Sequence, residues 1–409
     1  MKKNFLRIYA VSLASAPILS AYAGIASVDL GTILLFLCGL ISLLAVGNIK
    51  LQLPKGYLPF LFFSIVCSSI VVSRVPLGLI LFVLNIIIAL NCTKLQYLVK
   101  YYSFLVYCSC ALFVVQEMTF ILSGARISGM IPGLPLVYQD ISEAYIQRML
   151  TVSRSSSFFL EPAYFAEFLF PFIIIKLFAN TKKSRIEAIA VSAIMLLVRS
   201  GTGVFLLLIV WGAWFFFGSF KKSTKYSVAV VLGFVFTALL LYGGFEQSLY
   251  NRAQELDFDR GALGESSSGF IRFYRGYYYY AELPFINKLF GAPADVVDSI
   301  MNLYYSFSVN KNSTFLNGAQ TLLINYGFFS FVFYMRHLFQ YCYKVKFEVK
   351  VIAVCCVYLM LSESFFLTSK LLLCTILMCL LSMNDSKFPF VRSKVKKVTA
   401  VKGNNCKNL

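Results

Sequence analysis

The sequence predicts an all-α polytopic membrane protein with about twelve transmembrane helices. Of the 409 residues, 59% are hydrophobic and only 13% are charged, whereas about a quarter of the residues in soluble domains are charged. Apolar runs of about 17 to 25 residues, the length that crosses a bilayer as a helix, recur along the whole chain. No part of the chain is both long and polar enough to form a separate soluble domain of ordinary size.

The predicted spans are separated by short connections and by two long ones. The spans lie at about 6–25, 29–47, 56–73, 76–92, 102–123, 160–178, 186–199, 202–219, 226–244, 318–340, 350–366 and 369–384. The chain therefore divides into helices 1–5 within 1–123, an outer loop at 124–158, helices 6–9 within 159–244, a large outer loop at 245–317, helices 10–12 within 318–384 and a basic tail at 385–409.

Lysine and arginine gather on one side of the predicted membrane. Most of the 37 basic residues fall at the N-terminus, in alternate connections or in the tail, together with few acidic residues. Cytoplasmic connections carry such an excess, so we expect both termini and the tail to be cytoplasmic. The net charge of +19 then indicates contact with the membrane surface, not with nucleic acid.

The residue inventory narrows the chemistry available at the outer face. The 11 cysteines follow no metal-ligand spacing and are expected to be small buried hydrophobes. The single histidine, His337, lies near the inner end of a predicted span. No phosphate-binding loop, zinc-protease or serine-hydrolase motif is present. Chemistry at the outer face would thus depend on carboxylates, arginines, tyrosines and amides, with no metal and no cofactor expected.

Three charged residues stand at the predicted start of the sixth span, 153-SRSSSFFLEPAYFAEFLFPFIII-175. Pro162 suits the first turn of a helix, which places Glu161 at the helix start, where a helix cap alone would explain it. Glu167 lies more than one turn inside the span, where a lone charge costs a few kcal/mol or more. We expect it to face a cation or water. An intramembrane ion pair and a catalytic role for Arg154, Glu161 and Glu167 both remain open.

A second intramembrane charge, Arg199, lies in 196-LLVRSGTGVF-205. The apolar halves on either side of RSGTG predict a hairpin at the outer face, with the glycines permitting the bend. Backbone N–H groups at such a turn are able to bind an anion. The alternative is a simple turn with an arginine that extends to the interface.

The large outer loop contains 265-ESSSGFIRFYRGYYYYAELPFINKLFGAP-293. Arg272 and Arg275 are three residues apart and would share one face of an α-helix. The tyrosines and the apolar stretch that follow predict a helix at the membrane interface, with the arginines directed at an anion. That anion is either lipid phosphate in general or a substrate phosphate. Arg252 and Asn317 are further loop candidates.

The order of these features resembles the O-antigen polymerase (Wzy) family. The resemblance is carried by Arg154 followed by SFFLEPAYFAEFL, by LLVRSGTG, and by the large outer loop with SSSGFIRFYRG, ELPFINKLFGAP and FLNGAQTLLINYGFFSFVFY. It covers most of the chain through short motifs. The related O-antigen ligases typically carry a histidine near the last segment, where this chain has Asn317 and no histidine, which favours a polymerase.

The resemblance implies a GT-C-like glycosyltransferase of the bacterial cytoplasmic (inner) membrane. It would join oligosaccharide repeat units carried on undecaprenyl pyrophosphate, as in lipopolysaccharide or other polysaccharide biosynthesis. We assign Arg154, Arg199, Arg272 and Arg275 to the pyrophosphates. Glu161 is the first choice for the general base and Glu167 the second. A flippase for lipid-linked oligosaccharide and an O-antigen ligase are the alternatives, and the need for a chain-length regulator is left open.

Overall fold

The computed structural model describes most of the chain. The described residues are 2–25, 28–47, 52–54, 56–73, 75–137, 155–179, 181–218, 271–303, 316–343, 345–383 and 390–392, with four isolated positions between 219 and 270. Helices form nearly all of this structure, which confirms an all-α protein. The few strands have two or three residues each and form two small antiparallel pairs.

The elements of the first half end at residue 123. They are α1 (Lys2–Leu19), β1 (Ala23–Ile25), β2 (Val28–Asp29), α2 (Leu30–Val46), β3 (Gln52–Pro54), α3 (Tyr57–Leu61), the π-helix η1 (Phe62–Cys67), α4 (Ser68–Val72), α5 (Leu77–Cys92) and α6 (Leu95–Ser123).

The second half contains the remaining helices. They are α8 (Pro162–Phe178), α9 (Lys182–Leu197), α10 (Gly201–Phe217), the π-helix η2 (Ile271–Arg275), α15 (Gly276–Glu282), α16 (Phe285–Phe290), α17 (Ala294–Leu303), α18 (Gly318–Gln340), α19 (Phe347–Ser362), α20 (Ser369–Met383) and the strand β4 (Phe390–Arg392).

Each predicted span corresponds to a helix or a run of helices, except the span at 226–244, of which only the isolated positions 226, 230 and 233 are described. Two boundaries are wrong by more than a few residues. α1 ends at Leu19 instead of near residue 25, because the next residues form the β1–β2 hairpin. α6 begins at Leu95 instead of near residue 102. Hydropathy marks only the apolar part of this helix, while Lys100 and its neighbours are good helix formers.

Among the described helices, α6 alone is long and apolar enough to cross a membrane by length and composition. Several other apolar helices, including α2, α5, α10 and α20, have between 10 and 17 residues. A 17-residue helix is about 25 Å long, at the lower limit for the hydrocarbon core. By length, these helices lie at or below the limit for crossing a bilayer.

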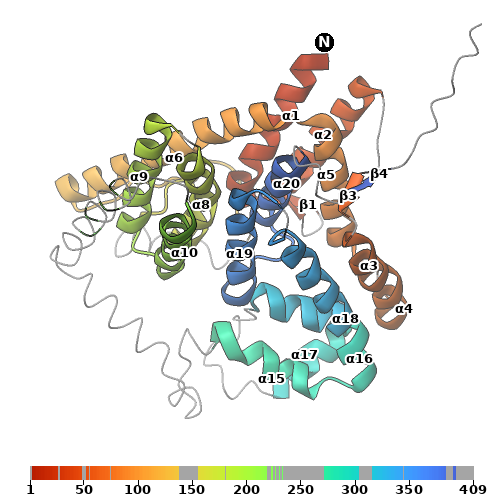
Figure 1. Cartoon of the computed structure of the whole chain (residues 1–409). Coiled ribbons are helices and arrows are strands. Elements are labelled where there is room, and N and C mark those ends of the chain that lie inside the picture. Colours follow the sequence, from red (N-terminus) through yellow and green to blue (C-terminus); the bar gives the residue numbers. More distant parts are fainter. Residues whose placement is uncertain are drawn as a thin grey trace, which may run out of the picture.

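The core of the molecule is centred on α8 and α20. Most side chains of both helices are buried, including those on the faces that do not touch each other. Figure 1 shows α8, α9 and α10 grouped together in green, with α19 and α20 in blue between them and α5. Since both faces of α8 and α20 are covered by protein, a charged group on either helix must find its partner inside the bundle.

Connections that the sequence placed on the same side of the membrane contact one another. At one end, the segment after α1 pairs with the loop after α6, where the Ala23 amide donates to the Pro135 carbonyl at 2.8 Å. At the other end, β3 before α3 pairs with β4 in the tail. We call the first the outer end and the second the inner end of the bundle.

α18 is interrupted at Gly327, which has φ 81° and ψ 173°. The short helix α16 packs against this break, and the Ala292 amide donates to the Ile324 carbonyl at 2.8 Å. The break leaves backbone carbonyls of α18 without a partner inside the helix, and the Ala292 amide binds one of them. In Figure 1 the helices α15, α16 and α17 lie at the foot of α18, so the predicted loop segment 282–293 is packed against the bundle.

We predict that Gly327→Ala destabilises the protein by about 1–3 kcal/mol, since this backbone conformation is nearly restricted to glycine. A Cβ at this position would also meet the backbone of Leu289. Thermal unfolding in detergent measures the effect. Gly212→Ala is the control, because its Cβ meets nothing within 4 Å and the helix gains a better helix former. Equal melting temperatures for both variants would contradict the prediction.

Candidate functional site

The centre of the candidate site is an ion pair between Glu167 of α8 and Lys370 of α20. Both side chains are almost completely buried. The Lys370 ammonium also lies 3.6 Å from the centroid of the Tyr164 ring, which stands one helical turn before Glu167. Glu167 therefore faces a cation, as predicted, and that cation is Lys370.

A second buried carboxylate, Glu363, lies at the C-terminal end of α19. The Thr202 hydroxyl in the first turn of α10 donates to the Glu363 carboxylate at 2.5 Å. The backbone carbonyl of Glu363 accepts from the Gly318 amide, at the start of α18, at 2.8 Å. This one residue thereby joins the outer ends of α10, α18 and α19.

Two further carboxylates, those of Glu363 and Glu161, lie close enough to act electrostatically on Glu167, in opposition to Lys370. Glu161 is the N-cap residue of α8 and precedes Pro162, as predicted, although its side chain makes no capping hydrogen bond. Its position at the positive end of the helix and a catalytic role are both compatible with this geometry. Within the described residues, no three or more His, Cys, Asp or Glu side chains are arranged to hold a metal ion.

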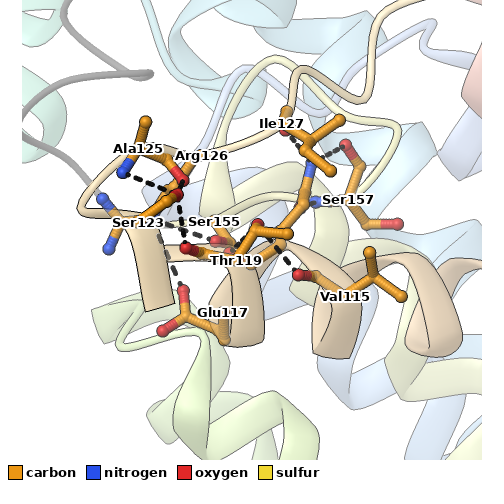
Figure 2. A network of polar contacts seen from close by, with 10 residues as sticks. Val115, Glu117, Thr119, Ser123, Ala125, Arg126, Ile127, Ser155 and Ser157 are labelled. Atoms are coloured by element: carbon orange, nitrogen blue, oxygen red, sulfur yellow. Dashed lines mark hydrogen bonds and ion pairs between the residues drawn. The ribbon is translucent and has the colours of Figure 1, made fainter. Parts of the chain in front are cut away.

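A cluster of polar side chains surrounds Arg126 at the end of α6 (Figure 2). The Nε of Arg126 donates to the Ser155 hydroxyl at 3.1 Å and lies 3.6 Å from a carboxylate oxygen of Glu117. Its guanidinium lies 3.6 Å from the centroid of the Phe120 ring. The arginine is thus held flat against α6 by an acid, a hydroxyl and an aromatic face.

Gln116 connects the residue directly after this arginine, Ile127, with Ser157 in the segment before α8. Its amide nitrogen donates to the carbonyls of Ile127 and Ser157, and its amide oxygen accepts from the Ser157 amide at 2.9 Å. Ser157 has a left-handed backbone, with φ 57°, and its hydroxyl donates to the Ser109 carbonyl at 2.7 Å. One buried glutamine therefore ties the start of the outer loop to the segment that leads into α8.

Arg199 lies at the predicted hairpin, between α9 and α10. The expectation that glycines make the bend was wrong, because the left-handed residue is Arg199 itself, with φ 55°, and Gly201 and Gly203 are helical. Ser200 occupies the N-cap of α10 and accepts from the Gly203 amide, which leaves the turn to the preceding residue. Burial lowers the pKa of Arg126; Glu117 opposes this effect and the nearby charge of Arg199 adds to it.

The segment with Arg272 and Arg275 is helical but differs from the predicted form. It is the π-helix η2, whose hydrogen bonds join residues five apart, so a spacing of three does not give the shared face of an α-helix. Arg275 is buried, which lowers its pKa, while Tyr279 opposes the shift. The next residue, Gly276, packs against the Gln320 side chain of α18. The Arg272 side chain lies outside the described part of the chain.

Asn317 has a structural role as the N-cap of α18. It exchanges hydrogen bonds with Gln320 in a capping box, and its side-chain amide donates to the Leu361 carbonyl at 2.8 Å. Arg154 and Arg252 lie outside the described residues, although Ser155, which follows Arg154, is the hydroxyl that holds Arg126.

Sequence reasoning missed Lys370, Glu363 and Arg126. Lys370 and Glu363 fall inside predicted spans, so the reasoning that selected Glu167 would have found them. Arg126 stands directly after a span, where an arginine is ordinary, and only its contacts set it apart. His337 is buried far from the site, among the rings of Tyr57, Tyr334 and Tyr341.

Comparisons with known proteins add no relative. No known protein family, no curated protein and no solved structure matches this chain.

We predict that Lys370→Met destabilises the protein by about 3–5 kcal/mol, because it leaves Glu167 buried without its partner cation. The double variant Glu167→Gln/Lys370→Met should recover much of this loss. Thermal unfolding of the four members of this double-mutant cycle measures the coupling. Lys183→Met, at an exposed position of α9, is the matched control and should be near neutral. Additive effects of the two single substitutions would contradict the buried pair.

Proposed function

We propose that this protein is a membrane glycosyltransferase that polymerises oligosaccharide repeat units carried on undecaprenyl pyrophosphate. The observation that carries the proposal is the gathering of Glu161, Glu167, Glu363, Arg126 and Arg199 at one end of the helix bundle. These are residues from four separate helices and their connections. The proposed reaction needs arginines for the pyrophosphate and a carboxylate for the hydroxyl proton, and this end of the bundle supplies both kinds of side chain.

The proposed reaction uses these groups in two ways. Arginines bind the pyrophosphate of the donor through charge-assisted hydrogen bonds. The hydroxyl oxygen of the acceptor sugar then bonds to the anomeric carbon of the donor as the bond from that carbon to the pyrophosphate oxygen breaks. The hydroxyl proton passes to a carboxylate, for which Glu161 is the first choice because Lys370 already occupies Glu167. Undecaprenyl pyrophosphate is the leaving group.

The proposal places the chain in the bacterial inner membrane, with about twelve transmembrane helices and both termini in the cytoplasm. Support comes from α6, which exposes large apolar side chains such as Phe104, Ile121 and Leu122. The contacts within the outer and inner ends of the bundle agree with alternating connections. The exposed apolar surface of α6 suits lipid better than water.

The large outer loop fits the same proposal through its short helices. α16 exposes Phe285 and Ile286 while its other contacts hold it against α18. Tyr274 and Tyr278 are exposed as well, and exposed apolar and tyrosine side chains suit the membrane interface, where a lipid-linked substrate presents its headgroup. A GT-C-like arrangement, with polar loops over a helical bundle, follows from the resemblance. A chain-length regulator is a further partner that the proposal leaves open.

A flippase is the second candidate, since a buried ion pair between helices is also typical of transporters. The position of the buried charges favours the polymerase, because among the described residues the buried Glu167, Glu363 and Lys370 lie toward the outer end instead of following a path through the bundle. A ligase is less favoured. The single histidine, His337, lies in an aromatic cluster toward the inner end and has no contact with the site.

Glu161→Gln and Arg272→Ala are each predicted to abolish long-chain polysaccharide while the protein remains in the membrane. The first removes the proposed base and the second a proposed pyrophosphate ligand. Immunoblotting of membranes and gel analysis of surface polysaccharide measure the two properties. Glu348→Gln and Arg336→Ala, toward the inner end, are the matched controls. Normal chain lengths in both site variants would contradict the assignment.

Deletion of the gene should leave single repeat units capped on the surface lipid, because export and ligation continue without polymerisation. A gel of the surface lipid would show one short rung. Loss of a flippase would leave almost no repeat units at the surface, so that pattern would contradict the polymerase. Assembly of purified lipid-linked units into a polymer by the isolated protein provides the direct biochemical test.

A further inference from the structure

Arg126 carries more hydrogen-bonding capacity than its surroundings use. Its side chain is only 9% exposed, and its Nη1 is buried without a hydrogen-bond partner among the described residues. The contacts to Ser155 and Glu117 both involve Nε. An unsatisfied guanidinium nitrogen in a buried position costs free energy unless a ligand or water binds there.

The charge around Arg126 is also incompletely balanced. Glu117 is its ion-pair partner at 3.6 Å, which is longer than a close charge-assisted hydrogen bond, and that carboxylate is 30% exposed. A second arginine, Arg199, is close enough to repel it. Like charges disfavour each other, so a bound anion would relieve the repulsion between Arg126 and Arg199.

We propose that Arg126 binds a phosphate group at the outer end of the bundle, through the guanidinium nitrogen that the described residues leave without a hydrogen bond. The arginine fork matches two phosphate oxygens, and Nη1 is the group left over for such a contact. Arg199 is set beside α10 by its left-handed turn, three residues before Thr202, which holds Glu363. A phosphate at this site therefore lies next to the carboxylate group of the same bundle end.

In this proposal Arg126 binds the ligand directly, in addition to its structural ion pair with Glu117. Gln116 holds Ile127, directly after Arg126, and Ser157, two residues after Ser155, so the backbone next to the arginine is held by contacts that need no ligand. The identity of the ligand as a lipid-borne pyrophosphate rests on the proposed function. The binding of a phosphate group does not.

The test compares Arg126→Gln with Glu117→Gln in purified full-length protein in nanodiscs of neutral phosphatidylcholine. Two probes distinguish the sources of the phosphate: inorganic pyrophosphate in solution and undecaprenyl pyrophosphate in the nanodisc. Binding is measured by the rise in melting temperature with probe concentration. We expect Arg126→Gln to weaken the binding of at least one probe by roughly 10- to 100-fold, the effect of losing charge-assisted hydrogen bonds.

Glu117→Gln separates binding from structure. It removes the competing acid, so we expect phosphate binding that is unchanged or tighter, together with a lower melting temperature of the unliganded protein. Arg126→Lys keeps the charge but loses the fork and should fall between wild type and Arg126→Gln. Arg336→Gln, at an exposed position toward the inner end, is the matched control.

Two results would overturn the inference. One is equal weakening of probe binding by Glu117→Gln and Arg126→Gln, which indicates a purely structural ion pair. The other is binding of both probes by Arg126→Gln as by wild type. If the deletion shows the flippase pattern while binding depends on Arg126, the phosphate site stands and the polymerase proposal fails. If the deletion shows the polymerase phenotype and Arg126→Gln binds both probes as tightly as wild type does, only this inference fails.

Discussion

The buried ion pair between Glu167 and Lys370 constrains the rest of the structure. α8 and α20 are covered by protein on nearly every face, so neither charge has access to bulk water. A buried charge without its partner is strongly destabilising, whereas a matched apolar pair is often tolerated. The pair therefore fixes the two helices in one relative position. Glu161 is the N-cap of α8 and Glu363 the C-cap of α19, the helix before α20, so the same constraint brings their carboxylates near Glu167.

The outer end of the bundle separates positive from negative groups across a few residues of α10. Arg199 directly precedes the N-cap of α10 and acts electrostatically on Arg126, while Thr202 in the first turn of α10 binds Glu363. The proposed phosphate site and the Glu363 carboxylate would therefore both lie near the start of α10. Such an arrangement suits a substrate whose phosphate and reacting hydroxyl differ in charge.

Irregular backbone positions the outer segments. The break of α18 at Gly327 receives α16, and the π-helix η2 brings Arg275 toward the start of α18. Freed carbonyls at the break are partly satisfied by the loop, as in the Ala292–Ile324 bond. The segment 271–303 is therefore attached to the bundle through specific backbone contacts.

The sequence by itself determined the helical class, the approximate positions of the helices and the partner requirement of Glu167, because apolar length and the cost of a buried charge are local properties. It also placed Pro162 in the first turn of α8. Only the tertiary structure decided that Lys370 is the partner, that the charge of Arg199 acts on Arg126 and that Asn317 is a cap. These contacts join residues far apart in the chain, such as Thr202 and Glu363, and spacing along one sequence carries no information about them.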